Sequence, residues 1–107
     1  RPYLIRYSDI ALTYAEAAGP TPLAYSLVNY IRQRAGLSQL DPNLSLQDFR
    51  EAVLNERKYE LAFEGNWCYD LRRLHTDIQA AREQGLTAEK MVFYPIPSME
   101  TDLNPNL

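Results

Sequence analysis

Residues 55–73 read NERKYELAFEGNWCYDLRR and place charges of both signs where a helix should bury apolar side chains. The residues just before this run carry Leu46, Phe49 and Val53 at i, i+3 and i+7, the spacing of a single helix face. The next positions on or beside that stripe are Glu56, Glu60, Phe63, Glu64 and Trp67. Carboxylates therefore continue a stripe that faces the core, and a buried carboxylate is tolerated only when it is paired or protonated.

The run thus predicts a structural network of ion pairs that ties the third helix to the fourth. Its expected members are Glu56, Arg57, Glu60, Glu64, Asp70, Arg72 and Arg73. Carboxylates spaced i, i+4 and i+8 on one helix face are also what a glycosidase or a carboxylate metal site uses. Here the neighbouring arginines would neutralise such a site, and the Glu-x-x-His motifs of di-iron bundles are missing. We predict no catalytic residue and no metal ligand.

Length and composition indicate one soluble globular domain over residues 1–107. The chain is 46% hydrophobic and 23% charged, and its net charge of -3 argues against binding to nucleic acid. A single cysteine, Cys68, excludes a disulfide framework within the chain and a zinc site built on cysteines. Cys68 and His75 lie too far apart on a helix for a thiol–imidazole pair, and no phosphate-binding glycine loop is present. No cofactor is implied.

Apolar periodicity predicts an all-α fold of two packed helix pairs. The first helix, over residues 6–18, carries a stripe of Tyr7, Ile10, Tyr14 and Ala17 that we expect to face the core. Ala11, Ala15 and Ala18 lie alongside it as small residues for close packing. Thr21 and Pro22 begin the second helix, which Gly36 closes. Its expected buried stripe is Ala24, Leu27, Val28, Ile31 and Ala35.

The second pair completes the expected bundle. A capping box at Ser45 begins a third helix that should run to Phe63 or Glu64, and a fourth is expected from Trp67 to about Glu83. After Gly85 the character of the sequence changes. The segment MVFYPIP, residues 91–97, has prolines at alternate positions and should form an extended tail that wraps the bundle. Ser98 should begin at most a short turn.

Aromatic residues are the remaining candidates for binding. The chain has eight tyrosines and one tryptophan, and aromatic rings with polar tips suit both sugar stacking and protein interfaces. Core packing is the better explanation for the tyrosines on the first two helices. Trp67 and Tyr69 follow Gly65, where a loop could present them, so they are the candidate ligand-binding residues.

Four ordered blocks of the sequence resemble the SusD/RagB family of outer-membrane nutrient-binding lipoproteins. RYSDIALTYAEA at residues 6–17 is similar to the family's Arg-Tyr-Ala-Glu…Tyr-Ala-Glu-Ala helix, and NYIRQRAGL at residues 29–37 to its Asn-x-Ile-Arg-x-Arg-Ala-Gly-Leu segment. Residues 56–73 resemble its Glu-Arg-Arg-x-Glu-Leu-Ala-Phe-Glu-Gly and Asp-Leu-Arg-Arg blocks. YPIP at 94–97 and NPNL at 104–107 resemble its C-terminal ending. The chain corresponds to the C-terminal portion of such a protein.

The resemblance implies tetratricopeptide-like helix pairs and a non-catalytic subunit that captures glycans or other nutrients at the cell surface. It also implies a SusC-like TonB-dependent transporter as partner, and attachment to the outer membrane through a lipid anchor that lies outside this chain. Where relatives usually have a His-Arg pair after Glu-Gly, this chain has Asn66 and Trp67. A helical-repeat adaptor that binds only protein is the alternative function.

Overall fold

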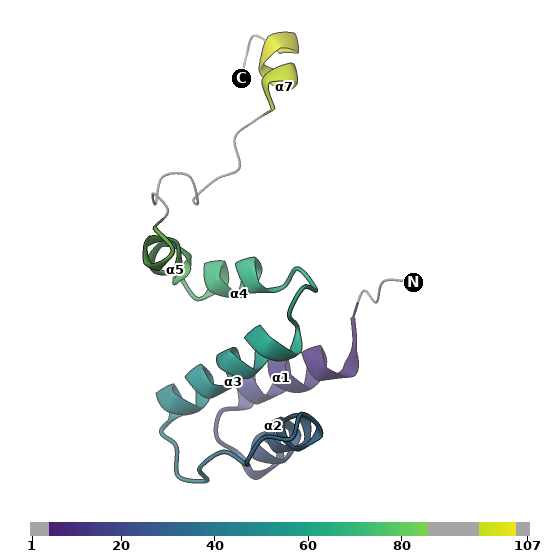
Figure 1. The fold of residues 1–107 in the computed structure, drawn as a ribbon, viewed down its shortest axis with the longest axis vertical. Coiled ribbons are helices and arrows are strands. Elements are labelled where there is room, and N and C mark those ends of the chain that lie inside the picture. The colour runs from purple at the N-terminus through teal and green to yellow at the C-terminus, as the bar shows by residue number, and fades with distance from the viewer. Residues whose placement is uncertain (1–4, 86–96, 105–107) are drawn as a thin grey trace. The chain divides into compact units, whose positions relative to one another are not determined.

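The computed structural model describes residues 5–85 and 97–104, and these are helical with no strand among them. The helices are α1 (Tyr7–Ala18), α2 (Pro22–Arg34), α3 (Leu46–Glu60), α4 (Trp67–Arg73), α5 (Asp77–Glu83) and α7 (Ser98–Leu103) (Figure 1). The predicted all-α class is confirmed. The chain divides into two compact units, Arg1–Asp70 and Leu71–Leu107. Among the described residues, no helix combines the length and the apolar character needed to cross a bilayer.

The first two helices begin and end close to where the sequence placed them. Thr21 caps α2, because its side-chain oxygen accepts a hydrogen bond from the Ala24 N–H at 3.4 Å, and Pro22 occupies the first turn. Between the helices, Gly19 has a φ of 71° and is buried. The turn favours glycine for this conformation, and a Cβ here would also lie 2.9 Å from Cδ1 of Leu46, the end of a side chain that would have to shift.

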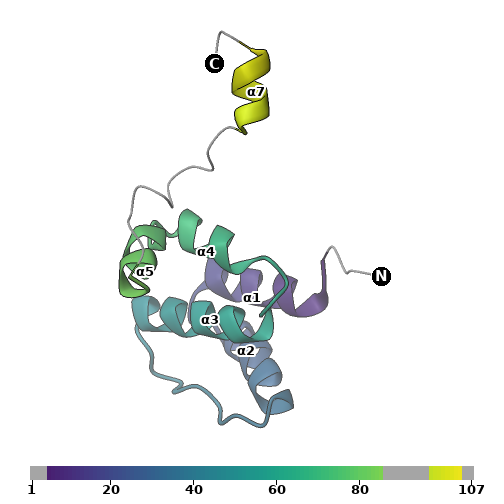
Figure 2. The ribbon, with the colours of Figure 1, turned by 45° about the horizontal axis from the view of Figure 1, so that its top comes forward.

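Helices α1, α2 and α3 pack together around the core of the first unit, with α1 in contact with both of the others (Figure 2). Its central buried residues are Ala11, Leu12, Ala15, Ala24, Val28, Ile31, Phe49 and Val53. The expected core stripe on α1 was wrong for Tyr7, Ile10, Tyr14 and Ala17, which are exposed, whereas Ala11 and Ala15, expected beside it for close packing, are buried. Alanines face inward instead, and their small side chains let α1 approach two neighbours closely.

Helix α3 begins as predicted but ends earlier. Ser45 accepts a hydrogen bond from the Asp48 N–H at 3.1 Å and caps the helix, which ends at Glu60. The expected continuation to Phe63 or Glu64 was wrong, because the chain turns over residues 61–65. Leu61 is buried at the start of this turn, and Phe63 adopts a left-handed φ of 64° that a helix cannot contain.

The single helix expected from Trp67 to about Glu83 was also wrong, because it is broken into α4 and α5. The break is a Schellman motif centred on His75, which has a φ of 57°. The Thr76 N–H donates to the Leu71 carbonyl at 2.9 Å and the His75 N–H donates to the Arg72 carbonyl at 3.0 Å. These two bonds satisfy the last carbonyls of α4 and stop it there.

Near the C-terminus, α7 forms a helix of six residues where the sequence predicted at most a short turn at Ser98. Most of the expected extended tail, residues 91–96, lies outside the described residues.

Candidate functional site

An ion cluster joins the ends of α1, α2 and α3. The Arg6 guanidinium donates from Nη1 to Oε1 of Glu60 at 2.6 Å, and from Nε to both carboxylate oxygens of Glu64 at 2.8 and 2.9 Å. Arg34 of α2 also pairs with Glu60. One arginine thus bridges two carboxylates and one carboxylate bridges two arginines, which fixes the end of α3 against the other helices.

Glu56, one turn before Glu60, is buried and pairs with Arg32 of α2. The glutamates of α3 are therefore paired with Arg6, Arg32 and Arg34, which lie far from α3 in the sequence. The sequence analysis considered only arginines close to the run, because distance along a chain does not reveal which helix packs beside another.

A second cluster centres on Arg57, which is buried. Its Nε donates to Oδ2 of Asp70 at 2.8 Å, and its Nη1 lies 2.9 Å from Oδ1 of Asp9 and 3.0 Å from the Thr13 hydroxyl oxygen. Asp70 is buried as well. Arg57 thus ties α1, α3 and the first turn of α4 together, across the turn that contains Gly65. Arg72 is exposed at the end of α4, as is its neighbour Arg73.

The charge state of Glu60 makes the first cluster sensitive to acid. Burial alone would raise the pKa of Glu60, but hydrogen bonds from Arg34 and Arg6 outweigh it and lower the pKa from 4.5 to about 2. A depressed pKa stabilises the folded protein above the unfolded value, and this contribution is lost as the pH falls from 4.5 toward 2. Hydrogen bonds to Glu64 and Glu60 likewise raise the pKa of Arg6.

We therefore expect the stability advantage of the native protein over a Glu60→Gln variant to shrink between about pH 5 and pH 2, by about 1 to 2 kcal/mol once solvent screening is allowed for. Urea unfolding at several pH values measures this difference. A difference that stays constant over the acidic range would show that Glu60 does not titrate within the ion cluster.

Paired in this way, the carboxylates support the fold and are poorly suited to general acid–base work. An acid and a base of distinct pKa are needed for glycoside hydrolysis, whereas Glu56, Glu60 and Glu64 each hold an arginine. Cys68 and His75 are both exposed. Across the part of the chain that the structure describes, no three His, Cys, Asp or Glu side chains gather as a metal site.

The clusters hold a turn that displays aromatic side chains. We call Tyr59, Phe63, Trp67 and Tyr69 the aromatic turn. Tyr59, Phe63 and Tyr69 are exposed and Trp67 is half-buried. The Lys58 ammonium lies 5.6 Å from the Tyr59 ring centroid and 5.4 Å from that of Trp67, so it makes cation–π contacts with both rings. Exposed ring faces beside a cation can stack on sugars or anchor a protein partner.

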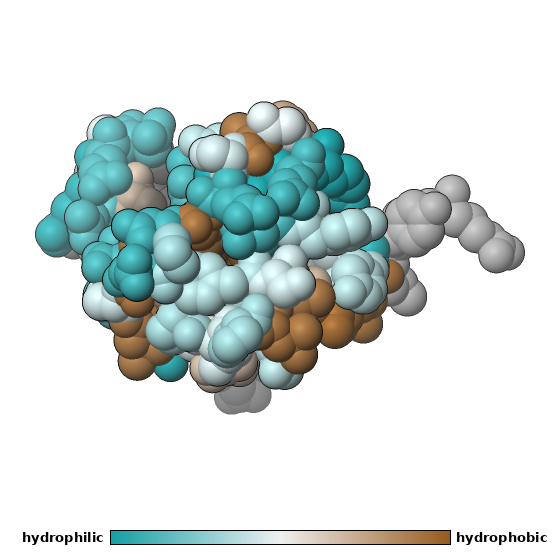
Figure 3. Space-filling model, turned by 90° about the horizontal axis from the view of Figure 1, so that it is seen from below, coloured by the Kyte–Doolittle hydropathy of each residue, from teal (hydrophilic) through white to brown (hydrophobic). Residues whose placement is uncertain are grey.

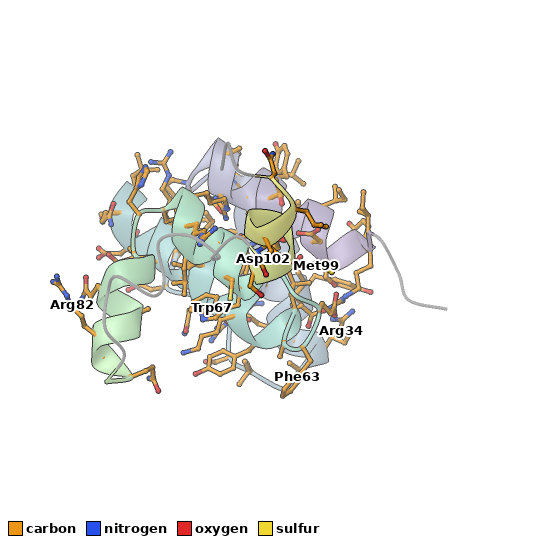
Figure 4. All side chains as sticks on the ribbon, turned by 90° about the horizontal axis from the view of Figure 1, so that it is seen from above. Arg34, Phe63, Trp67, Arg82, Met99 and Asp102 are labelled. Carbon is orange, nitrogen blue, oxygen red and sulfur yellow. The ribbon has the colours of Figure 1, made fainter. Side chains whose placement is uncertain are left out.

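Phe63 stands out within this turn. Its side chain is 107% exposed relative to a reference residue, and Figure 4 shows it pointing away from the ribbon. A left-handed φ is uncommon for a bulky residue, and such strain often lies at functional sites. A fully exposed phenyl ring on a strained backbone contributes nothing visible to the core of this unit.

Substituting Phe63→Gly should therefore stabilise the protein by about 1 kcal/mol, because glycine adopts this φ without strain. Urea unfolding measures the change. Ala62→Gly is the matched control, because residue 62 lies next to Phe63 and has no positive φ itself. This substitution should not stabilise the protein. If Phe63→Gly lowered the free energy of unfolding as much as Ala62→Gly does, the backbone at Phe63 would not be strained.

Trp67 and Tyr69 were the residues predicted from the sequence, and they stand at i and i+2 of α4, which places them on different sides of that helix. The Tyr59 and Trp67 rings share the Lys58 ammonium, and Phe63 is a further exposed ring in the turn between the two helices. Tyr59 and Phe63 were missed because the expected helix ran through them and put Phe63 on its buried stripe. The signal that could have found them is the spacing of the four aromatic residues around Gly65.

Comparison with known proteins places the chain in a family. A profile described as the SusD family matches residues 1–107. The chain is 36% identical over 121 residues to SusD-like protein P2 of Formosa agariphila, with 96% of this chain and 24% of that protein covered. It is 34% identical over 119 residues to SusD-like protein P25 of the same organism, with 97% and 22% covered. The chain thus spans about a quarter of the length of these curated relatives. No solved structure matches significantly.

Proposed function

Because the chain belongs to the SusD family, we propose that it is the helical part of a non-catalytic, nutrient-binding protein of an outer-membrane uptake system. The observation that carries this proposal is the match of the family profile over the whole chain. Two curated relatives bearing the SusD-like name, aligned over nearly all of this chain, support it. The pairing of the α3 glutamates with arginines supports a binding role over a hydrolytic one.

For the whole protein, we also propose a cellular location and a partner protein. A protein of this kind lies at the outer surface of the outer membrane, held by a lipid anchor, and delivers its ligand to a SusC-like TonB-dependent transporter. The ligand class is an oligosaccharide or another nutrient. The family match supports each of these points, and the geometry of this chain is compatible with them.

Within this chain, the aromatic turn is the surface that we propose for contact with the ligand. Trp67 and Tyr59, which share the Lys58 ammonium, are its best-defined part, and Tyr69 and Phe63 are further exposed rings close by in the sequence. Flat aromatic faces stack on the apolar faces of sugar rings, and Lys58 adds a hydrogen-bond donor beside two of the rings. The ion clusters support this surface, because Arg6 bonds to the turn through Glu64 and Arg57 bonds through Asp70 to α4.

A glycan-array screen of the full-length protein tests the function. We expect binding to at least one class of oligosaccharide, and no release of reducing ends when that oligosaccharide is incubated with the protein. Release of reducing ends would contradict the non-catalytic role. Failure to bind any glycan or other nutrient, together with stable binding to a protein partner, would favour the adaptor function instead.

A further inference from the structure

The outer face of α1 and α2 is unusually apolar for a surface. On α1, Tyr7, Ile10 and Tyr14 lie at i, i+3 and i+7, and on α2, Leu23, Leu27 and Tyr30 lie at i, i+4 and i+7. We call these six residues the outer face. Five are exposed large side chains and Leu27 is half-buried. Seen from below, from the side on which α2 lies in Figure 1, the surface has brown apolar residues among pale ones over its lower part and teal hydrophilic residues over much of its upper part (Figure 3).

The two stripes belong to one surface. A hollow of about 540 Å³ lies between them, and Tyr7 of α1 borders it together with Leu27 and Tyr30 of α2. Arg6 and Arg34 line the same hollow, next to their shared partner Glu60. One end of the outer face is therefore a groove, which Ser8 and Ser26 also line and which the two arginines make charged, while Ile10, Tyr14 and Leu23 lie outside its lining.

The charge pattern separates this face from the solvated side of the same unit. Arg34 is the only charged residue among the exposed positions of α1 and α2, whose residues are all described. Helix α3, by contrast, exposes Asp48, Arg50, Glu51 and Lys58. A helix facing water carries charges in the way that α3 does, and large contiguous apolar patches are rare on soluble proteins. The exposed sides of α1 and α2 have the composition of a buried interface.

We propose that the outer face is the interface with the remainder of the same, longer polypeptide, which seats an apolar helix or strand in the groove. The curated relatives are about four times as long as the part that this chain matches, so a full-length member has ample chain to cover the face. The covering segment presents apolar side chains to Ile10, Tyr14 and Leu23. Opposite the charged end it presents hydrogen-bond acceptors, carbonyl or carboxylate, to Arg34 and to the hydroxyls of Tyr7 and Tyr30.

Photo-crosslinking of the full-length protein identifies the occupant. With p-benzoylphenylalanine in place of Tyr14, irradiation should join position 14 to a peptide outside residues 1–107 of the same molecule. A crosslink to residues 71–107, or a crosslinked dimer whose yield rises with protein concentration, would overturn the proposal. The same photo-reactive residue in place of Gln47, which is exposed on α3, is the control and should give little crosslink, because its excited ketone relaxes unreacted when no C–H bond lies within reach.

Hydroxyl-radical footprinting of the unsubstituted full-length protein gives a second reading that needs no variant. Tyr7 and Tyr30 are 66% and 59% exposed here, and Tyr59 and Tyr69 of the aromatic turn are 68% and 74% exposed. In the full-length protein we expect Tyr7 and Tyr30 to react at least about fivefold more slowly than the other pair, since buried rings are shielded from solvent. Equal, fast oxidation of all four would overturn the proposal.

The inference is independent of the ligand proposed for the aromatic turn. If all four tyrosines are protected in the ligand-free protein, the outer face is covered as proposed, and the aromatic turn loses its role as an open binding surface. If Tyr7 and Tyr30 react fast, the outer face is open to solvent and the binding proposal is unaffected.

Discussion

Replacing Arg57 by methionine should lower the free energy of unfolding by about 3 to 5 kcal/mol. Arg57 is buried and pairs with Asp70, which is buried too, and with Asp9. Removing the guanidinium takes away one partner of a buried carboxylate, so less of the desolvation penalty of that carboxylate is offset. Methionine keeps the length of the side chain, so lost packing contributes little.

Arg50→Met is the matched control, because Arg50 lies exposed on the same helix. It should change stability by no more than about 0.5 kcal/mol. Adding Asp70→Leu to Arg57→Met should recover part of the loss, since the buried charge is then gone. Urea unfolding of the four proteins measures these effects, and a cost for Arg57→Met equal to that for Arg50→Met would show that the second cluster does not hold the fold.

The other large effect is expected at Phe49, where alanine should destabilise the protein by about 3 to 5 kcal/mol. Phe49 is fully buried between the helices and packs edge-on against Tyr25, with ring centroids 4.8 Å apart. Deleting the ring leaves a cavity at the point where α3 meets α2, and close-packed neighbours relax into such a space only in part.

Leu46→Ala on the same helix is the control, because Leu46 is 48% exposed and should cost about 1 kcal/mol or less. Denaturant midpoints compare the two variants. A Phe49→Ala variant that unfolds at the same urea concentration as Leu46→Ala would contradict the assignment of Phe49 to the centre of the core.

Capping residues and the stripes of α2 and α3 made much of the fold predictable. Thr21, Pro22 and Ser45 act within one turn of sequence, so local rules suffice to place the starts of α2 and α3. The buried residues Val28, Ile31, Phe49 and Val53 follow the expected period as well.

The misplaced features depend on packing between helices. Tyr7, Ile10 and Tyr14 form a better apolar stripe than Ala11 and Ala15 do, yet the alanines face inward because α1 lies against two helices at once. The periodicity of apolar residues shows which face of a helix is the most hydrophobic, but it does not show how many other helices pack against that helix. If the outer face is covered in the full-length protein, the prediction that the tyrosine stripe is buried is correct, but the stripe packs against another part of the polypeptide and not against α2 and α3.

Both wrong helix ends involve residues with a left-handed backbone that are not glycine. Phe63 and His75 lie where the chain leaves the expected helices, which were predicted to run to Phe63 or Glu64 and to about Glu83. Glycine has a strong local preference for this conformation, whereas phenylalanine and histidine give no such signal in the sequence. The partners in the ion clusters could not be predicted from neighbouring residues either, because Arg6 lies 54 residues from Glu60 in the sequence.

Within residues 55–73, we propose that the charged residues stabilise the fold and that the aromatic residues bind the ligand. Titration calorimetry on the full-length protein, with the oligosaccharide found by the array and a melting curve for each variant, tests this most directly. Glu60→Gln should lower the melting temperature and leave the affinity unchanged. Trp67→Ala and Tyr69→Ala should weaken binding about tenfold, the loss of one stacked ring, and Tyr69→Ala should melt as the native protein does. Unchanged affinity in both aromatic variants, or lost affinity in a folded Glu60→Gln, would contradict the account.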